Sequence, residues 1–292
     1  MIHFANVYAA LLSPRNDDGV IDRDSLRTQF RSVEGNGLVG YALNGATGEF
    51  TTASEDELEL TLDVAREMVP QAEILCGIGA GDVRGAVARG KIAAKYGAKG
   101  VLLPMPYFFP YRQDDLKAFA LQVASEIEVP VLLYNLPQFT SGLEVSTAID
   151  LMTSHKNIVG IKDSSGSLDI VRAMTDAKMQ ESRIIGNDSA LCDAMRGGLC
   201  DGLVSGVAST LPDLMTRLFA LGMQGKDFAA EEKLLDEFIA QINVLPTPWG
   251  LKVTSAVRGF TRESYPLPLS AQRKEEAQRI RDWFAAWHKA SF

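Results

Sequence analysis

The sequence predicts an α/β protein, a (β/α)8 TIM barrel with a C-terminal helical extension. Short apolar runs recur along the 292-residue chain, and each is followed by a turn and a segment of helical periodicity. Eight such units close a barrel, and α/β barrels of about 250 residues fold as one domain. After residue 225 the pattern becomes purely helical. We therefore expect a barrel over residues 1–225 and a helical extension packed on it over residues 226–292.

The expected strands and helices follow from local patterns. The strands cover residues 7–12, 38–43, 74–78, 101–103, 131–134, 158–161, 184–186 and 203–205. Ser54, with Glu57 three residues later, forms a capping-box pattern in front of apolar positions at helical spacing. Gly97 and the Gly35-Asn36-Gly37 segment are typical of helix ends. In the extension, one helical pattern is followed by two prolines and then by two more helices.

Composition and charge restrict the classes of function. The chain is 46% hydrophobic and 23% charged, as soluble globular proteins are, and no apolar run approaches the roughly 18 residues of a membrane span. A net charge of -8, with Lys and Arg spread along the chain, argues against nucleic acid as a partner. The N-terminus has no basic region before its short apolar run, so we expect no secretory signal and a cytoplasmic location.

Cysteine and histidine usage argues against a metal site and against a serine-hydrolase triad. The three cysteines lack metal-ligand spacing, and each lies in a stretch typical of a strand or of an apolar helix face, so we expect all of them to be buried: Cys76, Cys192 and Cys200. The three histidines are too few and too scattered to bind zinc or to form a Ser-His-Asp triad. We therefore expect no metal.

Lys162 is the first candidate for a reacting group. In barrel enzymes these groups come from the carboxyl ends of strands, and Lys162 ends an otherwise apolar strand. Burial there favours the neutral amine, which can attack a ketone and form an imine. The alternative is that Lys162 pairs with a nearby carboxylate such as Asp163 and only lines the pocket. The spacing alone leaves both interpretations open.

Tyr134 ends the preceding strand and is expected at the same mouth of the barrel. Imine chemistry needs a group that moves protons to and from the carbinolamine and the aldol hydroxyl, and a phenol near a cation can do so. The alternative for an isolated tyrosine is that it anchors a loop. By itself, the position of Tyr134 does not separate these roles.

The turn after the second strand is a candidate anion site. Gly45 and Gly48 flank Ala46 and Thr47, so the turn exposes consecutive backbone N–H groups. Such a turn can hold a carboxylate, and the Thr47 hydroxyl adds a donor. We expect Glu49 to brace the loop rather than to react. Glycine-rich turns are common, so this one is weak as a signal by itself.

Taken together, these stretches resemble the dihydrodipicolinate synthase and N-acetylneuraminate lyase family of pyruvate-dependent class I aldolases. The resemblance runs from the N-terminal strand to the start of the helical tail. It rests on motifs that occur in the family's order: Ser13-Pro14, Gly45 to Glu49, Pro106-Tyr107-Phe108, Tyr134-Asn135-Leu136-Pro137, Gly160-Ile161-Lys162-Asp163-Ser164, Gly186-Asn187-Asp188 and Gly202-Leu203-Val204-Ser205. Several motifs in register are far more specific than any one of them.

The resemblance implies roles for residues of this chain. Lys162 would form an imine with pyruvate, Tyr134 would shuttle protons, and Ala46 and Thr47 would hold the substrate carboxylate. The covalent lysine imine needs no metal and no organic cofactor. Substrate contacts are also expected at Phe139, Gly186, Asp188, Ser189, Val204 and Ser205. The resemblance implies a homotetramer built as a dimer of dimers.

Three positions depart from the pattern of the synthases. Their first turn threonine and a second tyrosine, which reaches in from a neighbouring subunit, are Ala46 and Phe108 here. Phe139 falls where the synthases hold the second substrate's carboxylate with an arginine, and a phenyl ring lacks the paired donors of a guanidinium.

We therefore predict an aldolase or lyase that reversibly cleaves a 2-oxo-3-deoxy sugar acid to pyruvate and an aldehyde. The alternatives are a 4-hydroxy-tetrahydrodipicolinate synthase acting on pyruvate and aspartate semialdehyde, and a Schiff-base hydro-lyase of a deoxy sugar acid. A barrel that binds a 2-oxo acid without catalysis is the alternative from a different class. Its weakness is that Lys162, Tyr134 and Thr47 are all present together.

Overall fold

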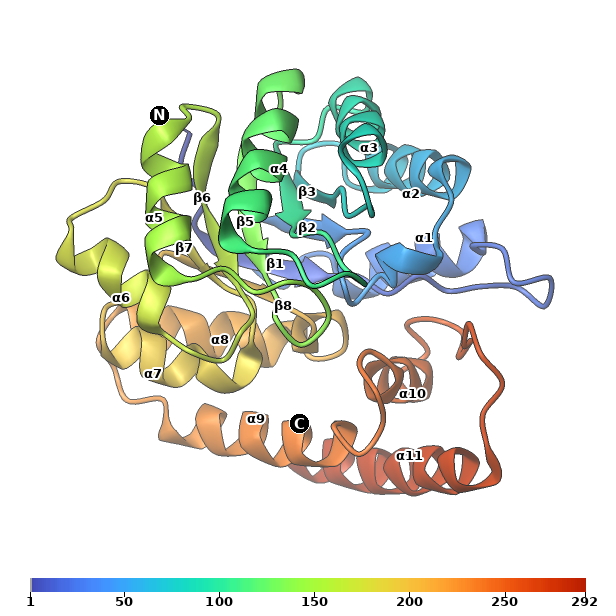
Figure 1. Cartoon of the computed structure of the whole chain (residues 1–292). Helices are drawn as coiled ribbons and strands as arrows, with labels where there is room; N and C mark the ends of the chain where they lie inside the picture. The colour runs from blue at the N-terminus through green and yellow to red at the C-terminus, as the bar shows by residue number, and fades with distance from the viewer. Residues whose placement is uncertain (1) are drawn as a thin grey trace.

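Eight parallel strands pair in sequence order and close into a barrel (Figure 1). The structure is a computed structural model that describes residues 2–292. Its strands are β1 (Asn6–Ala10), β2 (Gly40–Leu43), β3 (Glu73–Gly77), β4 (Gly100–Pro104), β5 (Val131–Asn135), β6 (Ile158–Asp163), β7 (Ser182–Ile185) and β8 (Gly202–Ser205). All eight predicted strands are present, and the predicted TIM barrel is confirmed.

Eight helices alternate with the strands around the outside of the barrel. They are α1 (Arg23–Val33), α2 (Glu55–Met68), α3 (Val83–Lys95), α4 (Gln113–Glu126), α5 (Val145–Ser154), α6 (Asp169–Asp176), α7 (Leu191–Arg196) and α8 (Pro212–Met223). The capping box predicted at Ser54 and Glu57 is formed at the start of α2. Gly97 follows α3 with a φ of 73°, a conformation that glycine adopts without strain.

Three further helices follow the barrel, as the purely helical pattern after residue 225 predicts. These are α9 (Ala229–Ile242), α10 (Trp249–Val257) and α11 (Ala271–Ser291), which lie together on one side of the barrel (Figure 1). Phe238 of α9 and Phe284 of α11 are fully buried, and their ring centroids are 5.7 Å apart. None of the helices within residues 2–292 is long and apolar enough to cross a membrane.

The core has an inner layer inside the barrel and an outer layer between strands and helices. Side chains alternate along each strand, so Leu132 and Tyr134 of β5 belong to the inner layer whereas Val131 and Leu133 pack in the outer one. The inner layer is filled by side chains and is not a pore. As expected, Cys76, Cys192 and Cys200 are buried free thiols.

Candidate active site

Lys162 and Tyr134 lie side by side at the carboxyl ends of neighbouring strands. The register of β5 and β6 places Tyr134 directly opposite Lys162. The Lys162 Nζ lies 3.9 Å from the centroid of the Tyr134 ring, and both side chains are buried, with 4% and 3% of their surface exposed. This contact brings the amine and the phenol together in one place.

The alternative pairing of Lys162 with Asp163 does not form. Because neighbouring strand residues point to opposite faces, the Asp163 carboxylate turns away from the mouth of the barrel. There its Oδ1 accepts hydrogen bonds from Asn135 Nδ2 at 3.1 Å and from the Ser165 backbone N–H at 2.9 Å. Within residues 2–292 no carboxylate oxygen lies within 4.0 Å of Lys162 Nζ, so the amine has no ion-pair partner.

Gly186 makes room for the lysine chain. A Cβ at this position would collide with Ser164 Oγ and lie only 2.6 Å from Lys162 Cε. Real carbon atoms rarely approach so closely, so any side chain at Gly186 would displace Lys162 or Ser164. The glycine predicted as a substrate contact therefore also has a packing role.

The turn after β2 is held rigidly by its own backbone and by neighbouring side chains. Asn44 and Glu49, at its two ends, have φ angles of 53° and 52°, in the left-handed region. The Glu49 N–H donates to Ala46 O at 3.0 Å, and Ser13 Oγ donates to Gly48 O at 2.8 Å. The turn is thus fixed before any ligand arrives.

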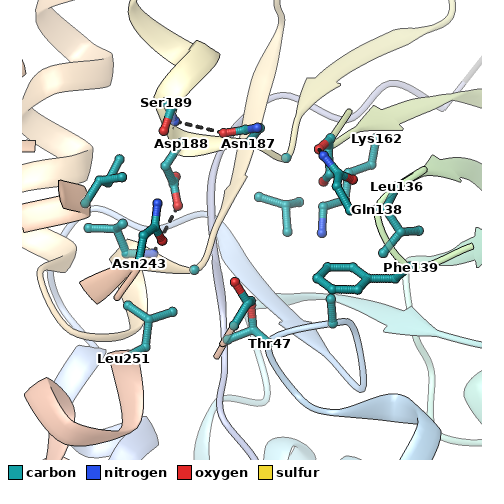
Figure 2. Close-up of a pocket in the computed structure, with 18 of the residues that line it drawn as sticks. Thr47, Leu136, Gln138, Phe139, Lys162, Asn187, Asp188, Ser189, Asn243 and Leu251 are labelled. Atoms are coloured by element: carbon teal, nitrogen blue, oxygen red, sulfur yellow. Dashed lines mark hydrogen bonds between the residues drawn. The ribbon is translucent and has the colours of Figure 1, made fainter. Parts of the chain in front are cut away.

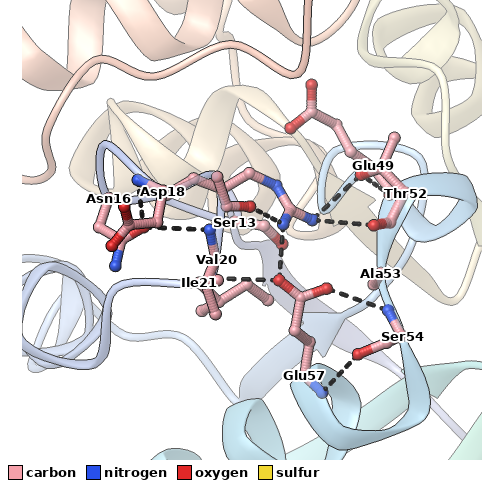
Figure 3. A network of polar contacts seen from close by, with 12 residues as sticks. Ser13, Asn16, Asp18, Val20, Ile21, Glu49, Thr52, Ala53, Ser54 and Glu57 are labelled. Atoms are coloured by element: carbon pink, nitrogen blue, oxygen red, sulfur yellow. Dashed lines mark hydrogen bonds and ion pairs between the residues drawn. The ribbon is translucent and has the colours of Figure 1, made fainter.

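Glu49 braces this turn against the helical extension, as predicted. Its Oε2 accepts from Lys252 Nζ of α10 at 2.5 Å, and both side chains are buried. The next residues are held by Arg15, whose guanidinium donates to the Thr52 hydroxyl at 3.1 Å and to Glu57 Oε1 at 2.6 Å. Figure 3 shows the part of this network around Thr52, Ser54 and Glu57.

A cavity of about 240 Å³ opens above Lys162 and Tyr134. The predicted residues that line it are Ala46, Thr47, Tyr134, Phe139, Lys162, Gly186, Asp188, Ser189 and Val204. In Figure 2, Asp188 and Asn243 lie on one side of the cavity and Lys162 and Phe139 on the other. Of the predicted contacts, Gly45, Gly48 and Ser205 are not among the lining residues.

Those three residues have supporting positions. Gly45 and Gly48 shape the turn through their carbonyls, which accept from the Phe50 N–H at 3.2 Å and from Ser13 Oγ. Ser205 is completely buried, and its hydroxyl accepts from the Ala208 N–H at 3.0 Å. Because that hydroxyl is used within the fold, Ser205 supports the wall of the cavity rather than facing it.

Two polar atoms at the cavity are buried without a hydrogen-bond partner. They are Asp188 Oδ1 and Ser164 Oγ. The other carboxylate oxygen of Asp188 accepts from the Val207 N–H at 3.2 Å. Burial raises the pKa of Asp188 above its ordinary value, which favours a neutral carboxyl that can donate as well as accept. Buried polar groups are nearly always satisfied, so both atoms are suited to hydroxyl groups of a ligand.

Part of the cavity wall was not among the substrate contacts predicted from the sequence. Leu136, Gln138 and Asn187 lie next to predicted residues in the chain, and adjacency was the available signal. The helical extension supplies a second set without any local signal: Ile239, Ile242, Asn243, Thr247 and Leu251. The extension therefore lies over the mouth of the barrel and forms part of the site.

An apolar recess of about 250 Å³ adjoins the cavity. The two share Ala46, Phe139 and Thr247 as lining residues. The Phe139 ring, 58% exposed, lies between them, so the position assigned to an arginine in the synthases presents an apolar surface here. Phe108, at the other substituted position, is 90% exposed and has a φ of 81°.

Comparison with known proteins gives consistent results over nearly the whole chain. The model of the dihydrodipicolinate synthetase family matches residues 3–286. A 4-hydroxy-tetrahydrodipicolinate synthase of Acidiphilium cryptum is 33% identical over 283 residues, which cover 91% of this chain and 92% of the relative. One from Methanosarcina barkeri is 28% identical over 284 residues, covering 96% and 97% of the two chains.

Solved structures agree. The 4-hydroxy-tetrahydrodipicolinate synthase of Methylacidiphilum fumariolicum superimposes with a TM-score of 0.88 at 28% identity, covering 99% of both chains. The order of the motifs, the closed barrel and the family match all lead to the same assignment. The chain belongs to the dihydrodipicolinate synthetase family.

Proposed function

We propose that this protein is a class I aldolase that reversibly cleaves a 2-oxo-3-deoxy sugar acid to pyruvate and an aldehyde. The observation that carries the proposal is the pairing of two features in one cavity. One is the buried Lys162 amine, which contacts Tyr134 and has no ion-pair partner within residues 2–292. The other is the pair of unsatisfied polar atoms on Asp188 and Ser164, which suit the hydroxyl groups of a sugar acid.

The first half of the reaction forms the imine. The Lys162 amine attacks the C2 ketone, and Tyr134 passes protons as the carbinolamine forms and loses water. The substrate carboxylate is held by backbone N–H groups at Ala46 and Thr47 and by the Thr47 hydroxyl. The product is a protonated imine, which can accept an electron pair.

The second half breaks the carbon–carbon bond. Tyr134 takes the proton from the C4 hydroxyl, the C3–C4 bond breaks, and its electron pair moves into the imine to give an enamine. The aldehyde leaves. Protonation at C3 restores the imine, and water hydrolyses it to pyruvate and free Lys162. Every step uses groups of this chain, substrate and water.

A second candidate is favoured by the names of the relatives, which are 4-hydroxy-tetrahydrodipicolinate synthases. The same imine with pyruvate would then add aspartate semialdehyde. Against this candidate, Phe139 offers no paired donors for a second carboxylate, and Ala46 lacks the hydroxyl of the synthase turn. A hydro-lyase that removes water from a deoxy sugar acid through the same imine is a third possibility.

Borohydride reduction tests the shared first step. Pyruvate with borohydride should attach a reduced three-carbon adduct to Lys162, which peptide mass spectrometry locates. The Lys162→Ala variant should take up none, whereas Lys156→Ala, which removes an exposed lysine shortly before the same strand, should label fully. A Lys162→Ala protein that still labels or still turns over would refute the assignment.

Substrate assays then separate the candidates. Release of pyruvate from a panel of 2-oxo-3-deoxy sugar acids supports the proposed aldolase. Consumption of pyruvate only when aspartate semialdehyde is present supports the synthase. Formation of a dehydrated 2-oxo acid without free pyruvate identifies the hydro-lyase. We also propose a homotetramer, in which assembly would cover the exposed Phe108 and Phe109, and sedimentation velocity measures its mass.

A further inference from the structure

Helix α10 contains one charged side chain, and that side chain is buried. Lys252 is 1% exposed, in a helix whose other residues, from Trp249 to Val257, are uncharged. Its Nζ donates to Glu49 Oε2 at 2.5 Å and to the Ser264 carbonyl at 2.6 Å. Burial lowers the pKa of Lys252, and the neighbouring Glu49 carboxylate opposes that change. The carboxylate partner therefore offsets part of the cost of burying the ammonium.

The partner is the residue that closes the carboxylate-binding turn. Glu49 has a φ of 52°, which an ordinary residue adopts only when its surroundings impose it. In that conformation its N–H donates to Ala46 O at 3.0 Å, and its carbonyl accepts from the Thr52 N–H at 2.9 Å. Because a peptide unit is planar, the bond from the Glu49 N–H to Ala46 O sets the direction of the Thr47 N–H. The bond from the Phe50 N–H to Gly45 O at 3.2 Å sets the direction of the Ala46 N–H in the same way, so a side chain that fixes Glu49 fixes both.

The same loop is tied to the extension a second time. Ser264, whose carbonyl accepts from Lys252, also accepts through its hydroxyl from the Arg15 N–H at 2.8 Å. Arg15 in turn holds Thr52, three residues beyond Glu49. One segment between α10 and α11 thus connects both basic residues that hold the turn.

Stability alone gives a weak reason for this arrangement. Burying two charges requires removing water from both, and apolar residues of similar volume in the place of a buried ion pair are often neutral or stabilising. What apolar residues cannot supply is a direction for the Glu49 side chain. An ion pair with two short hydrogen bonds from Lys252 supplies that direction.

From this geometry we infer that Lys252 is a positioning residue for substrate binding: through Glu49 it holds the Ala46 and Thr47 N–H groups in the geometry that binds the carboxylate of the 2-oxo acid. The inference rests on the proposed function. It assigns to the helical extension a role in recognising the reacting end of the substrate, in addition to forming part of the cavity wall.

The experiment measures how the rate of borohydride trapping at Lys162 depends on pyruvate concentration. In Lys252→Met the half-saturating concentration should rise about tenfold or more, which corresponds to about 1.4 kcal/mol of lost carboxylate binding. The trapping rate at saturating pyruvate should stay near that of the wild type, since Lys162 and Tyr134 are untouched. A general loosening of the site would lower that rate as well.

Two further variants keep the test sharp. Lys252→Met leaves Glu49 buried and unpaired and can fail to fold, so Glu49→Gln/Lys252→Met removes both charges at similar volume. It should fold and still need about tenfold more pyruvate. The matched control is Thr254→Val, which removes a buried hydroxyl from the same helix, bonded to Gly250 O at 3.1 Å and not to the turn. Thr254→Val should saturate as the wild type does.

The outcomes are distinct. Wild-type protein that never labels with pyruvate overturns the proposed function and the inference with it. Labelled wild type with an unchanged half-saturating concentration in the double variant overturns the inference alone. A rise in Thr254→Val as large as in the double variant also overturns it, because loss of helix packing would then explain the effect without the ion pair.

Discussion

Replacing Gly186 by alanine should displace the nucleophile while the fold survives. The new Cβ would collide with Ser164 Oγ and lie 2.6 Å from Lys162 Cε. The serine hydroxyl must rotate away, and since an ordinary carbon contact is about 3.5 Å, the lysine chain must move by about 0.9 Å. The backbone of Gly186 is not in the left-handed region, so alanine adopts it without strain. Since the displaced atoms border a cavity, we expect destabilisation of about 1 kcal/mol, at the low end for overpacking.

The catalytic effect should be much larger than the structural one. A misplacement of about 1 Å costs roughly 10²-fold in rate, or about 2.7 kcal/mol of transition-state stabilisation. The assay is single-turnover imine formation, followed by borohydride quenching, alongside thermal unfolding. Gly81→Ala is the control, because a Cβ there meets nothing within 4 Å. Turnover of Gly186→Ala within about threefold of wild type would refute the reasoning.

Three other predictions concern single groups. Tyr134→Phe keeps the ring beneath Lys162 but should slow proton transfer about 10² to 10⁴-fold, while borohydride still traps pyruvate at Lys162. Borohydride trapping that falls by the same factor as turnover would contradict the shuttle role. Because the pKa of Asp188 is raised above 3.8 in the folded protein, this carboxyl ionises at lower pH in the unfolded chain. As pH rises, the wild type should therefore lose stability relative to Asp188→Asn. Melting temperatures of the two proteins that differ by a constant amount across the pH range would contradict this. Burial raises the pKa of the thiols from 9.0 to about 12 at Cys76, Cys192 and Cys200. About a thousandfold less thiolate then forms at a given pH, so iodoacetamide should modify the three cysteines only after unfolding.

The barrel and the proximity of Lys162 and Tyr134 could be predicted from the sequence because both depend on local patterns. Each strand is a short apolar run, and a parallel barrel brings the carboxyl ends of successive strands together whatever the exact strand boundaries are. Lys162 and Tyr134 each end a strand, so their proximity follows from the topology. Whether Lys162 pairs with Asp163 could be decided only from the structure, because the direction of the Asp163 side chain shows that the two do not pair.

The contribution of the extension could not be predicted, because helical periodicity tells which face is buried but not against what. Asn243 and Leu251 reach the cavity only because α9 and α10 pack over the mouth of the barrel. Lys252 did leave a signal, as the one charge in an otherwise uncharged helix. Its partner lies 203 residues earlier, and no local pattern connects the two.

The ion pair between Lys252 and Glu49 also limits how this chain can be recombined with its relatives. A crossover near residue 225 falls between α8 and α9 and interrupts no helix or strand. It would nevertheless place Glu49 from one parent against the residue that the other parent has in place of Lys252. Chimeras that exchange the tail should therefore work best when the turn that ends at Glu49 and helix α10 come from the same parent.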